Sequence, residues 1–257
     1  MTGPGTRGAH SNARLDSLPP APLFKGLSPP ELAELAASAR ESRVVRKQPL
    51  FREGEPAREV SLLCAGRAKI TQLTASGDVV ILRLAGPGEV VGGLGLAPGA
   101  LHPATPEALE PCDVLSWDAR VFEGFTSRFP ALQRNSLRIL AERVRDLEER
   151  YRELATENVA PRLARTLLRL LGQIGRPHGG AVLIGLSREE LGQMTGTTLF
   201  TVSRLLSQWE SQGFLKAIRE AVVVGDPRGL VGVAEGASRD DAAAAWAVRE
   251  ERIRIRP

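Results

Sequence analysis

The sequence predicts an α+β chain in which an N-terminal jelly-roll β-barrel, a long helix and a C-terminal winged helix-turn-helix follow one another. Three observations carry this prediction: many short apolar runs between glycine-rich turns, a heptad pattern in mid-chain, and two short helices joined at a glycine. A chain of 257 residues is long enough for two domains with their own cores. The expected divisions are a disordered leader at 1–22, a β-rich domain at 23–128, a long helix at 129–157, the winged helix-turn-helix at 158–232 and a tail at 233–257.

The composition excludes several classes of protein. No apolar run approaches the ~20 residues that span a membrane, and the N-terminus lacks the apolar stretch of a secretion signal. Two cysteines, Cys64 and Cys112, are too few for a disulfide framework, and their apolar neighbours predict buried thiols. No catalytic triad, metal-ligand spacing or phosphate-binding loop stands out. We therefore expect a cytoplasmic protein that is not an enzyme and has no metal site and no membrane partner.

The first domain is predicted to begin with a short helix from Leu27 to Ala39, for which Ser28 is the expected N-cap. Short alternating or apolar runs then follow, separated by glycine-rich turns. Many short strands with regular turns predict a barrel or sandwich. The expected strands lie at 42–45, 60–64, 68–71, 79–84 and 113–117.

A long helix is predicted to begin after Phe129 and Pro130, with apolar residues spaced alternately by three and four. That spacing is a heptad seam with Arg- and Glu-rich flanks, and it predicts a parallel homodimer. A helix that packs on its own domain is the alternative. The seam consists of Leu137, Leu140, Val144, Leu147, Tyr151 and Leu154.

The long helix is expected to break at Asn158. This residue is the predicted N-cap of the next helix, and Pro161 then lies in the first turn, where its missing N–H costs little. We interpret the junction at Asn158 as the hinge between the domains.

Residues 187–212 predict two short helices joined by a tight turn. Ser187 is the expected N-cap of the first helix because a glutamate follows at the capping-box spacing, and Gly196 supplies the turn. Thr197 or Thr198 is the expected N-cap of the second helix. The core-facing stripe of that helix consists of Val202, Leu205, Leu206 and Trp209.

Ser203 and Arg204 lie off this apolar stripe and give the second helix a polar, cationic face. In helix-turn-helix proteins that part of the helix enters the DNA major groove, and the β-rich stretch at 213–224 predicts the wing. An ordinary helical hairpin is the alternative. Residues 159–225 contain eight Arg or Lys and four Glu, an excess of four charges that equals the net charge of +4. This bias predicts double-stranded DNA as a partner.

These motifs, in this order, resemble the CRP/FNR family of bacterial transcription regulators over about residues 24–225. The phrases FREGEPA, LCAGRAKI and LAGPGEVVGGLGL resemble the glycine-punctuated β-roll of cyclic-nucleotide-binding domains. The resemblance implies a homodimer that binds a palindromic DNA site, acts with RNA polymerase and responds allosterically to an effector. A ligand-binding dimer without DNA binding is the alternative from another class.

Within this resemblance, Arg204 matches the family's base-reading arginine, which predicts a guanine in each half-site. Ser203 matches a base- or phosphate-contacting serine of FNR-like members. Leu199 and Phe200 stand where CRP carries an arginine and an acidic residue, so we expect them to meet thymine methyl groups. The candidates for phosphate contact, which would otherwise act only as helix caps, are Ser187, Thr197 and Thr198.

The implied effector pocket lacks the contacts that bind cAMP. Gly93 stands where nucleotide-binding members carry a glutamate that bonds the ribose. Those members bind the cyclic phosphate with an Arg-Ser pair, which falls near His102 and Pro103 in this chain. Proline has no hydrogen-bond donor for a phosphate. Leu147 and Glu148 replace the Thr-Ser pair that contacts the base. The pocket residues are Gly92, Gly93, Leu94, His102 and Leu147.

The effector is therefore expected to be something other than cAMP. An iron–sulfur cluster is rejected because it needs about four cysteines. Haem stays a candidate, since some haem-sensing relatives carry a histidine near the position of His102, and it would make the protein a gas or redox sensor. Another small apolar or acidic effector, or control without any ligand, is also open.

Overall fold

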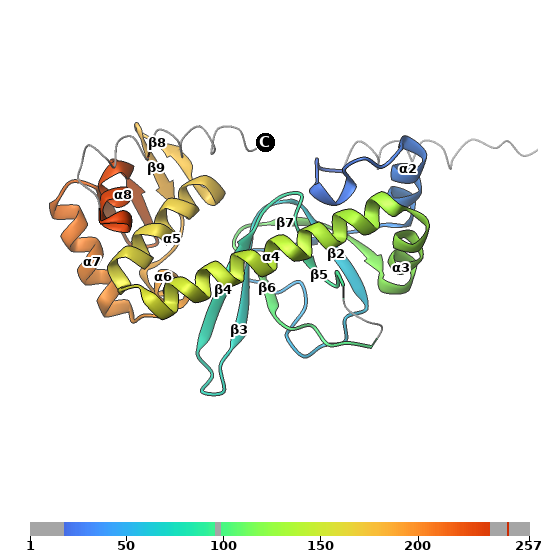
Figure 1. Cartoon of the computed structure of the whole chain (residues 1–257), viewed down its shortest axis with the longest axis horizontal. Helices are drawn as coiled ribbons and strands as arrows, with labels where there is room; N and C mark the ends of the chain where they lie inside the picture. The colour runs from blue at the N-terminus through green and yellow to red at the C-terminus, as the bar shows by residue number, and fades with distance from the viewer. Residues whose placement is uncertain (1–17, 96–98, 237–245, 247–257) are drawn as a thin grey trace, which may run out of the picture. The chain divides into compact units, whose positions relative to one another are not determined.

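The computed structural model describes residues 18–95, 99–236 and 246. The expected leader and tail lie largely outside these residues. The chain folds into two compact units, 1–146 and 147–257, and the boundary falls within a single long helix. Figure 1 traces the elements of both units, which are described separately below.

The first unit is a β-roll of two antiparallel sheets with helices at its ends. One sheet has four strands in the order β1-β7-β2-β5, and the other has three in the order β4-β3-β6. All five predicted strand runs fall in these sheets. In chain order the elements are η1 (Pro22–Phe24), α2 (Pro29–Ser38), β1 (Arg40–Val44), β2 (Glu59–Ala65), β3 (Ala68–Leu73), β4 (Val79–Ala85), β5 (Val90–Gly92), β6 (Thr105–Ala108), β7 (Cys112–Asp118), α3 (Ala119–Arg128) and α4 (Pro130–Thr156).

Strand β2 separates two apolar clusters because successive side chains point to opposite faces. Leu62 belongs to the cluster that includes Trp117 and residues of the helices, whereas Leu63 belongs to the cluster of the roll's interior. Trp117 is fully buried, and its Nε1 donates a hydrogen bond to the carbonyl oxygen of Leu35, 2.8 Å away. Each fully buried leucine of this kind contributes about 1.5–3 kcal/mol of transfer free energy.

Several details of this unit correct the sequence interpretation. Leu18 and Ala21 pack against the core, so the leader's last residues are part of the fold. Cys112 is buried as expected, but Cys64 is only half-buried. Helix α3 was not predicted, although Asp118 caps it and its buried face carries Phe122 and Phe125.

The second unit is a winged helix-turn-helix whose sheet has four strands in the order β10-β11-β9-β8. The predicted wing is β10 and β11, and the additional hairpin of β8 and β9 was not foreseen. After the last turns of α4, the elements are α5 (Val159–Ile174), β8 (Arg176–His178), β9 (Ala181–Ile184), α6 (Arg188–Thr195), α7 (Leu199–Ser211), β10 (Leu215–Ile218), β11 (Ala221–Val224) and α8 (Pro227–Glu235).

Helix α8 crosses the expected boundary between residues 232 and 233. Leu230, Val231 and Ala234 are buried on it, and α8 packs against α5. The start of the expected tail therefore belongs to the DNA-binding fold, because its apolar residues recur at helical spacing. Within the described ranges, no helix has both the length and the apolar character needed to cross a membrane.

Candidate nucleic-acid interface

Helix α6 begins with the predicted capping box. The Ser187 hydroxyl accepts a hydrogen bond from the backbone N–H of Glu190 at 3.2 Å, and the Glu190 carboxylate accepts from the backbone N–H of Ser187 at 2.9 Å. These reciprocal bonds satisfy two donors that the first turn of a helix leaves free. Two residues at the capping-box spacing thus fix the start of α6.

The turn between α6 and α7 depends on Gly196, which has φ +62° and ends α6 in the left-handed conformation. Residues with a Cβ atom resist that conformation, so glycine is favoured there. After the turn, the Thr198 hydroxyl accepts from the backbone N–H of Thr201 at 3.2 Å. Thr198, and not Thr197, is therefore the N-cap of α7.

Helix α7 has one buried face and one exposed face, as its sequence predicts. The buried stripe is Val202, Leu205, Leu206 and Trp209. On the other side, Leu199 is 45% exposed and Phe200 is 83% exposed. Arg204 is exposed and Ser203 is half-buried one turn further along. The structure brings the four predicted base-reading residues onto a single surface at the first half of α7.

Leu199 and Phe200 are exposed next to each other, and contiguous apolar surface marks interaction sites more often than a single exposed residue does. Phe200 lies beside Arg204 on the helix surface, since residues four apart share a face. A surface that joins one aromatic ring to one guanidinium matches the chemistry of base edges, which offer thymine methyl groups and guanine acceptors.

The wing adds cations that the sequence interpretation did not assign to the site. Lys216 on β10 and Arg219 at the hairpin turn are both exposed. The guanidinium of Arg188, at the start of α6, has a buried Nε with no hydrogen-bond partner in the described protein. Cationic groups at such positions suit phosphate contacts, which orient a protein on a duplex without reading sequence.

The charge excess counted over 159–225 overstates the cationic surface. Three of the counted arginines, all on α5, have partners within the protein. Arg162 donates to a backbone carbonyl, Arg165 pairs with Glu157, and Arg169 pairs with Glu153. Both glutamates lie just before residue 159, so the count over 159–225 left them out. Counting charges along the sequence could not reveal this, because the pairs form between helices. Exposed cations of the second unit include Arg204 on α7 and Lys216 and Arg219 on the hairpin of β10 and β11.

The three phosphate-contact candidates differ in the structure. The Ser187 hydroxyl already donates to Glu190 Oε2 at 3.0 Å, and glutamates in the first turn of α6 offset its positive end. The Thr198 hydroxyl acts in the cap of α7 but is exposed. Thr197 is half-buried and caps nothing.

Gly92 and Gly93 of the expected effector pocket lie close to neighbouring atoms. A Cβ atom at Gly93, which has φ +78°, would lie 2.1 Å from the carbonyl oxygen of Glu59, so this backbone does not accommodate a glutamate there. A Cβ atom at Gly92 would lie 2.2 Å from the Phe51 ring. Leu94 is buried on the same side of the fold, whereas Leu147 belongs to the second unit and is 54% exposed.

His102 is 5% exposed and stacks on Phe51 with 3.7 Å between the ring centres. Burial lowers the pKa of this imidazole below its ordinary value, which favours the neutral ring. Its Nδ1 is buried without a partner in the described part of the chain. The buried Nδ1 therefore has no open space around it in which an iron could bind.

A cavity of about 520 Å³ lies elsewhere on the first unit, on strands β1, β2 and β7. Residues of the expected pocket do not line it. Its lining includes Cys64, whose pKa is raised to about 11 by burial and nearby carboxylates, so the group stays a thiol at neutral pH.

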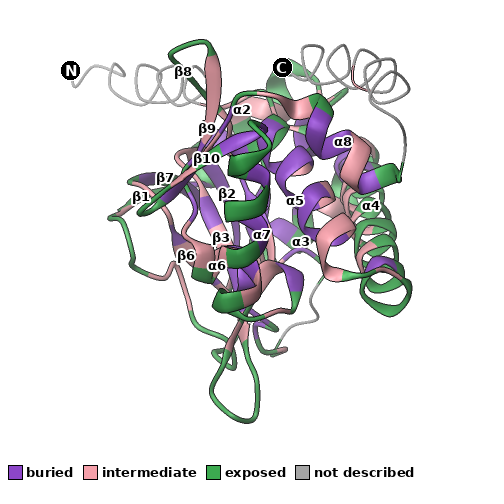
Figure 2. Cartoon of the chain, turned by 90° about the vertical axis from the view of Figure 1, so that its left-hand side faces the viewer, coloured by how far each residue is buried: buried purple, intermediate pink, exposed green. Residues whose placement is uncertain are grey.

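The predicted dimer seam is largely exposed on α4. Leu137, Val144, Leu147, Tyr151 and Leu154 are between 49% and 74% exposed. Figure 2 shows the middle of α4 as mostly exposed ribbon. Leu140 differs, because it packs against the core of the first unit and would lie 2.7 Å from a Cβ atom at Gly95. Arg143 also fastens α4 to this unit by donating to the carbonyl oxygen of Val90.

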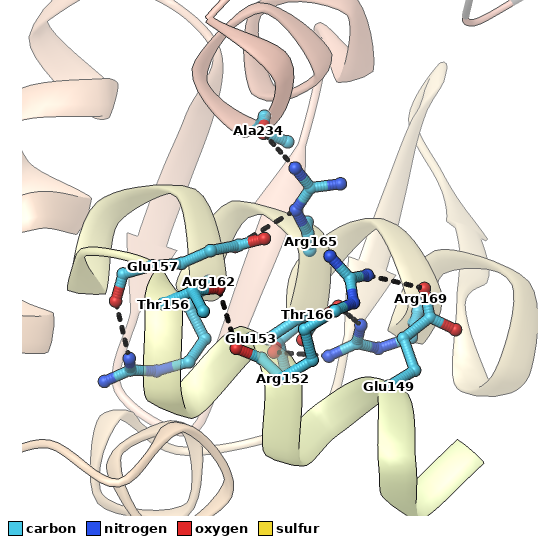
Figure 3. Close-up of polar contacts among 10 residues, drawn as sticks. All are labelled: Glu149, Arg152, Glu153, Thr156, Glu157, Arg162, Arg165, Thr166, Arg169 and Ala234. Carbon is cyan, nitrogen blue, oxygen red and sulfur yellow. Dashed lines mark hydrogen bonds and ion pairs between the residues drawn. The ribbon is translucent and has the colours of Figure 1, made fainter. Parts of the chain in front are cut away.

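Asn158 occupies the N-cap position of α5, but its side chain makes no capping hydrogen bond. The prediction was correct about where the helix begins and wrong about the cap. At this junction Arg162 and Arg165 bond Glu157, and Arg169 pairs with Glu153 (Figure 3). The sequence interpretation had counted these arginines only as surface charge.

Comparisons with known proteins agree with this geometry. The cyclic nucleotide-binding domain family matches residues 41–129, and the Crp-like helix-turn-helix domain family matches residues 161–232. The Cyclic AMP receptor protein of Thermus thermophilus is 29% identical over 210 residues, which cover 79% of this chain and 94% of that protein. The CRP-like cAMP-activated global transcriptional regulator of Mycobacterium tuberculosis is 25% identical over 210 residues, covering 81% and 94%.

Among solved structures, FixK2 from Bradyrhizobium japonicum is 26% identical, with a TM-score of 0.66 over 78% of this chain and 99% of that chain. Both halves of the chain, in the same order, thus match one group of non-enzymatic regulators. With its β-roll, its long α4 and its winged helix-turn-helix, the chain belongs to the CRP/FNR family of DNA-binding transcription regulators.

Proposed function

We propose that the chain acts in the cytoplasm as a homodimer that binds a palindromic DNA site with a guanine in each half, under the control of an effector other than cAMP. The observation that carries this proposal is the exposed surface of α7, where Phe200 and Arg204 stand clear of the buried stripe. Arg204 would donate to the O6 and N7 acceptors of guanine, and Phe200 with Leu199 would contact thymine methyl groups.

The apolar seam of α4 supports the homodimer. Tyr151 is 74% exposed and Leu137 is 62% exposed, so the described residues of a single chain leave most of both side chains uncovered. A second copy of the same seam would cover these side chains by heptad packing. Two recognition helices related by a two-fold axis would then meet half-sites about one DNA turn apart.

The closed surroundings of Gly93 and His102 support an effector other than cAMP. The backbone at Gly93 leaves no room for the glutamate that holds a ribose, and a neutral imidazole stacked on Phe51 is a poor substitute for a phosphate-binding arginine. The relatives named above are described as cAMP-activated or as cAMP receptors. We propose that this chain departs from them in its effector while keeping the DNA-binding architecture, and that it acts with RNA polymerase.

The proposal is tested by selecting bound sequences from random duplex DNA with the purified protein and no added effector. Enrichment of a two-fold symmetric site with guanine at the same place in each half is the expected result. Adding cAMP is expected to leave the enriched site and its affinity unchanged.

The result that contradicts the proposal is a folded dimer that enriches no sequence, with or without cAMP or haem. Such a protein would be a ligand-binding dimer without DNA binding. Enrichment only in the presence of cAMP would retain the DNA-binding assignment and overturn the proposal on the effector.

A further inference from the structure

Two arginine side chains from different elements of the first unit converge on one backbone carbonyl. Arg83 lies on β4, and its Nη2 donates to the carbonyl oxygen of Val90 at 3.2 Å. Arg143 lies on α4 and donates to the same oxygen from its own Nη2. A carbonyl oxygen has two lone pairs, so these two bonds use its whole acceptor capacity. Two guanidinium groups are therefore held close together at the start of β5.

The negative charge beside this pair does not balance it. Glu89 Oε2 lies 2.8 Å from Nη1 of Arg83, and the Glu89 side chain is 48% exposed. Among residues 18–95 and 99–236, no carboxylate forms an ion pair with Arg143. Two guanidinium charges against one carboxylate leave 2 − 1 = +1. The three side chains thus carry an excess of positive charge where α4 meets the β-roll.

Arg143 also keeps unused hydrogen-bond donors. A guanidinium has five N–H groups, and within the described part of the chain Arg143 bonds only Val90. Burial and the neighbouring Arg83 lower the pKa of Arg143 to about 10, so this half-buried group is still charged at neutral pH. A partly desolvated cation beside a second cation is unfavourable unless an anion completes the arrangement.

The chemistry of the two side chains indicates which anion would fit. Guanidinium groups bond carboxylates and phosphates through pairs of parallel N–H groups, and such charge-assisted bonds are stronger than neutral ones. His102 of the expected pocket offers nothing comparable, because burial favours its neutral ring. Neither Arg83 nor Arg143 is among the expected pocket residues, although Val90 lies only two residues before Gly92 on β5.

We propose that Arg83 and Arg143 form an anion site that holds a small molecule by a carboxylate or phosphate group, and that this molecule is the effector. Its identification as the effector rests on the proposed function, whereas the anion site itself does not. The bound group would bond β4 and α4 at once. Arg143 directly precedes Val144 of the dimer seam, so occupancy of the site would act on the helix that carries the seam.

The experiment titrates the full-length protein with inorganic phosphate and, separately, with acetate, up to about 100 mM at constant ionic strength. Chloride is the reference anion. NMR of protein with isotope-labelled arginine follows the Nε–Hε signals, and Arg83→Lys and Arg143→Lys assign those of the pair. We expect both signals to shift together and to saturate with one Kd. A response to phosphate alone would identify a phosphate group, and a response to acetate alone a carboxylate.

Removing either arginine should weaken binding at least about tenfold, because each supplies charge-assisted bonds to the anion. The remaining arginine reports the affinity in Arg83→Met and in Arg143→Met. Arg145→Met is the matched control, since it removes an exposed arginine of α4 two positions away. Its Kd should stay within about twofold of the wild type.

Glu89→Gln separates an anion site from a purely structural pair. Glu89 repels a bound anion and competes with it for Arg83, so its neutralisation should tighten binding at least about threefold. Arginines that only fasten α4 to the β-roll would give no saturable shift in the wild type and no gain in Glu89→Gln.

The anion site is overturned if neither ion gives a saturable shift, or if Arg143→Met and Arg145→Met bind equally well. If the methionine variants do not fold, the lysine variants decide, because lysine keeps the charge and loses the fork; unchanged affinity in both would overturn the site. Cyclic AMP that shifts the same two signals would support the site and overturn the proposal on the effector. Saturable binding by a protein that selects no DNA would support the site and contradict the proposed function.

Discussion

Replacing Arg204 with alanine should weaken DNA binding without weakening the fold. Arg204 is exposed on α7, and within the described part of the chain it forms no ion pair. Because Arg204 is exposed and unpaired there, its removal should change the free energy of unfolding by no more than about 0.5 kcal/mol. Any loss of DNA affinity can then be assigned to the DNA contact.

The size of that loss follows from one guanidinium in each copy. A bidentate arginine–guanine pair contributes about 1–3 kcal/mol of discrimination, and a symmetric dimer makes two of them. The expected loss is about 2–6 kcal/mol, which is at least about thirtyfold in affinity. The variant should also stop distinguishing guanine from other bases at the contacted position, whereas the wild type should keep doing so.

Fluorescence anisotropy at one fixed salt concentration measures these affinities, with the selected operator and with operators changed at the guanine of each half. Arg228→Ala is the matched control, because it removes an exposed arginine of the same unit away from α7. If Arg204→Ala retained the wild-type preference for guanine, the assignment of Arg204 would be refuted. A fall in both affinity and melting temperature would instead indicate a structural role.

Three further predictions concern other parts of the chain. Thr198→Ala removes the cap of α7 and should lower the free energy of unfolding by about 1 kcal/mol in urea titrations, whereas Thr197→Ala should have little effect. Val144→Glu should turn the dimer into a monomer in sedimentation without destabilising the single chain, because Val144 is 53% exposed, and a dimer that persists would contradict the seam. Because burial lowers the pKa of His102 below 6.5, the unfolded chain binds its proton more readily. Stability is then fully present above pH 6.5 and falls as the pH drops below it, and His102→Gln should flatten this part of the stability profile.

The helix-turn-helix could be predicted because its determinants are local. The capping box at Ser187, the left-handed Gly196 and the cap at Thr198 each depend on residues within three positions along the chain. The buried stripe of α7 follows from its spacing alone. Five of the seven strands of the β-roll were also foreseen, because glycine-rich turns separate runs of apolar residues in the sequence, whereas the short strands β5 and β6 were not.

What could not be predicted depends on contacts between distant residues. The seam predicts six equivalent positions, yet Leu140 is packed against its own unit because Gly95 allows a close approach. Phe51 stacks on His102, and nothing in the sequence joins these two residues. In the sequence, the arginines of α5 have the spacing of surface charges. In the structure, Arg165 pairs with Glu157 and Arg169 pairs with Glu153. The sequence interpretation also missed helices α3 and α8, although their buried residues recur at helical spacing.

Each unit contains a buried tryptophan of its own, Trp117 in the β-roll and Trp209 in α7. Indole emission shifts to longer wavelength when the ring enters water, so the full-length chain carries one natural optical reporter for each half. With Trp246→Phe to remove the remaining indole, replacing Trp117 or Trp209 in turn by phenylalanine would let the melting of each half be followed separately. Comparing the two midpoints with and without DNA would measure how strongly the halves stabilise one another.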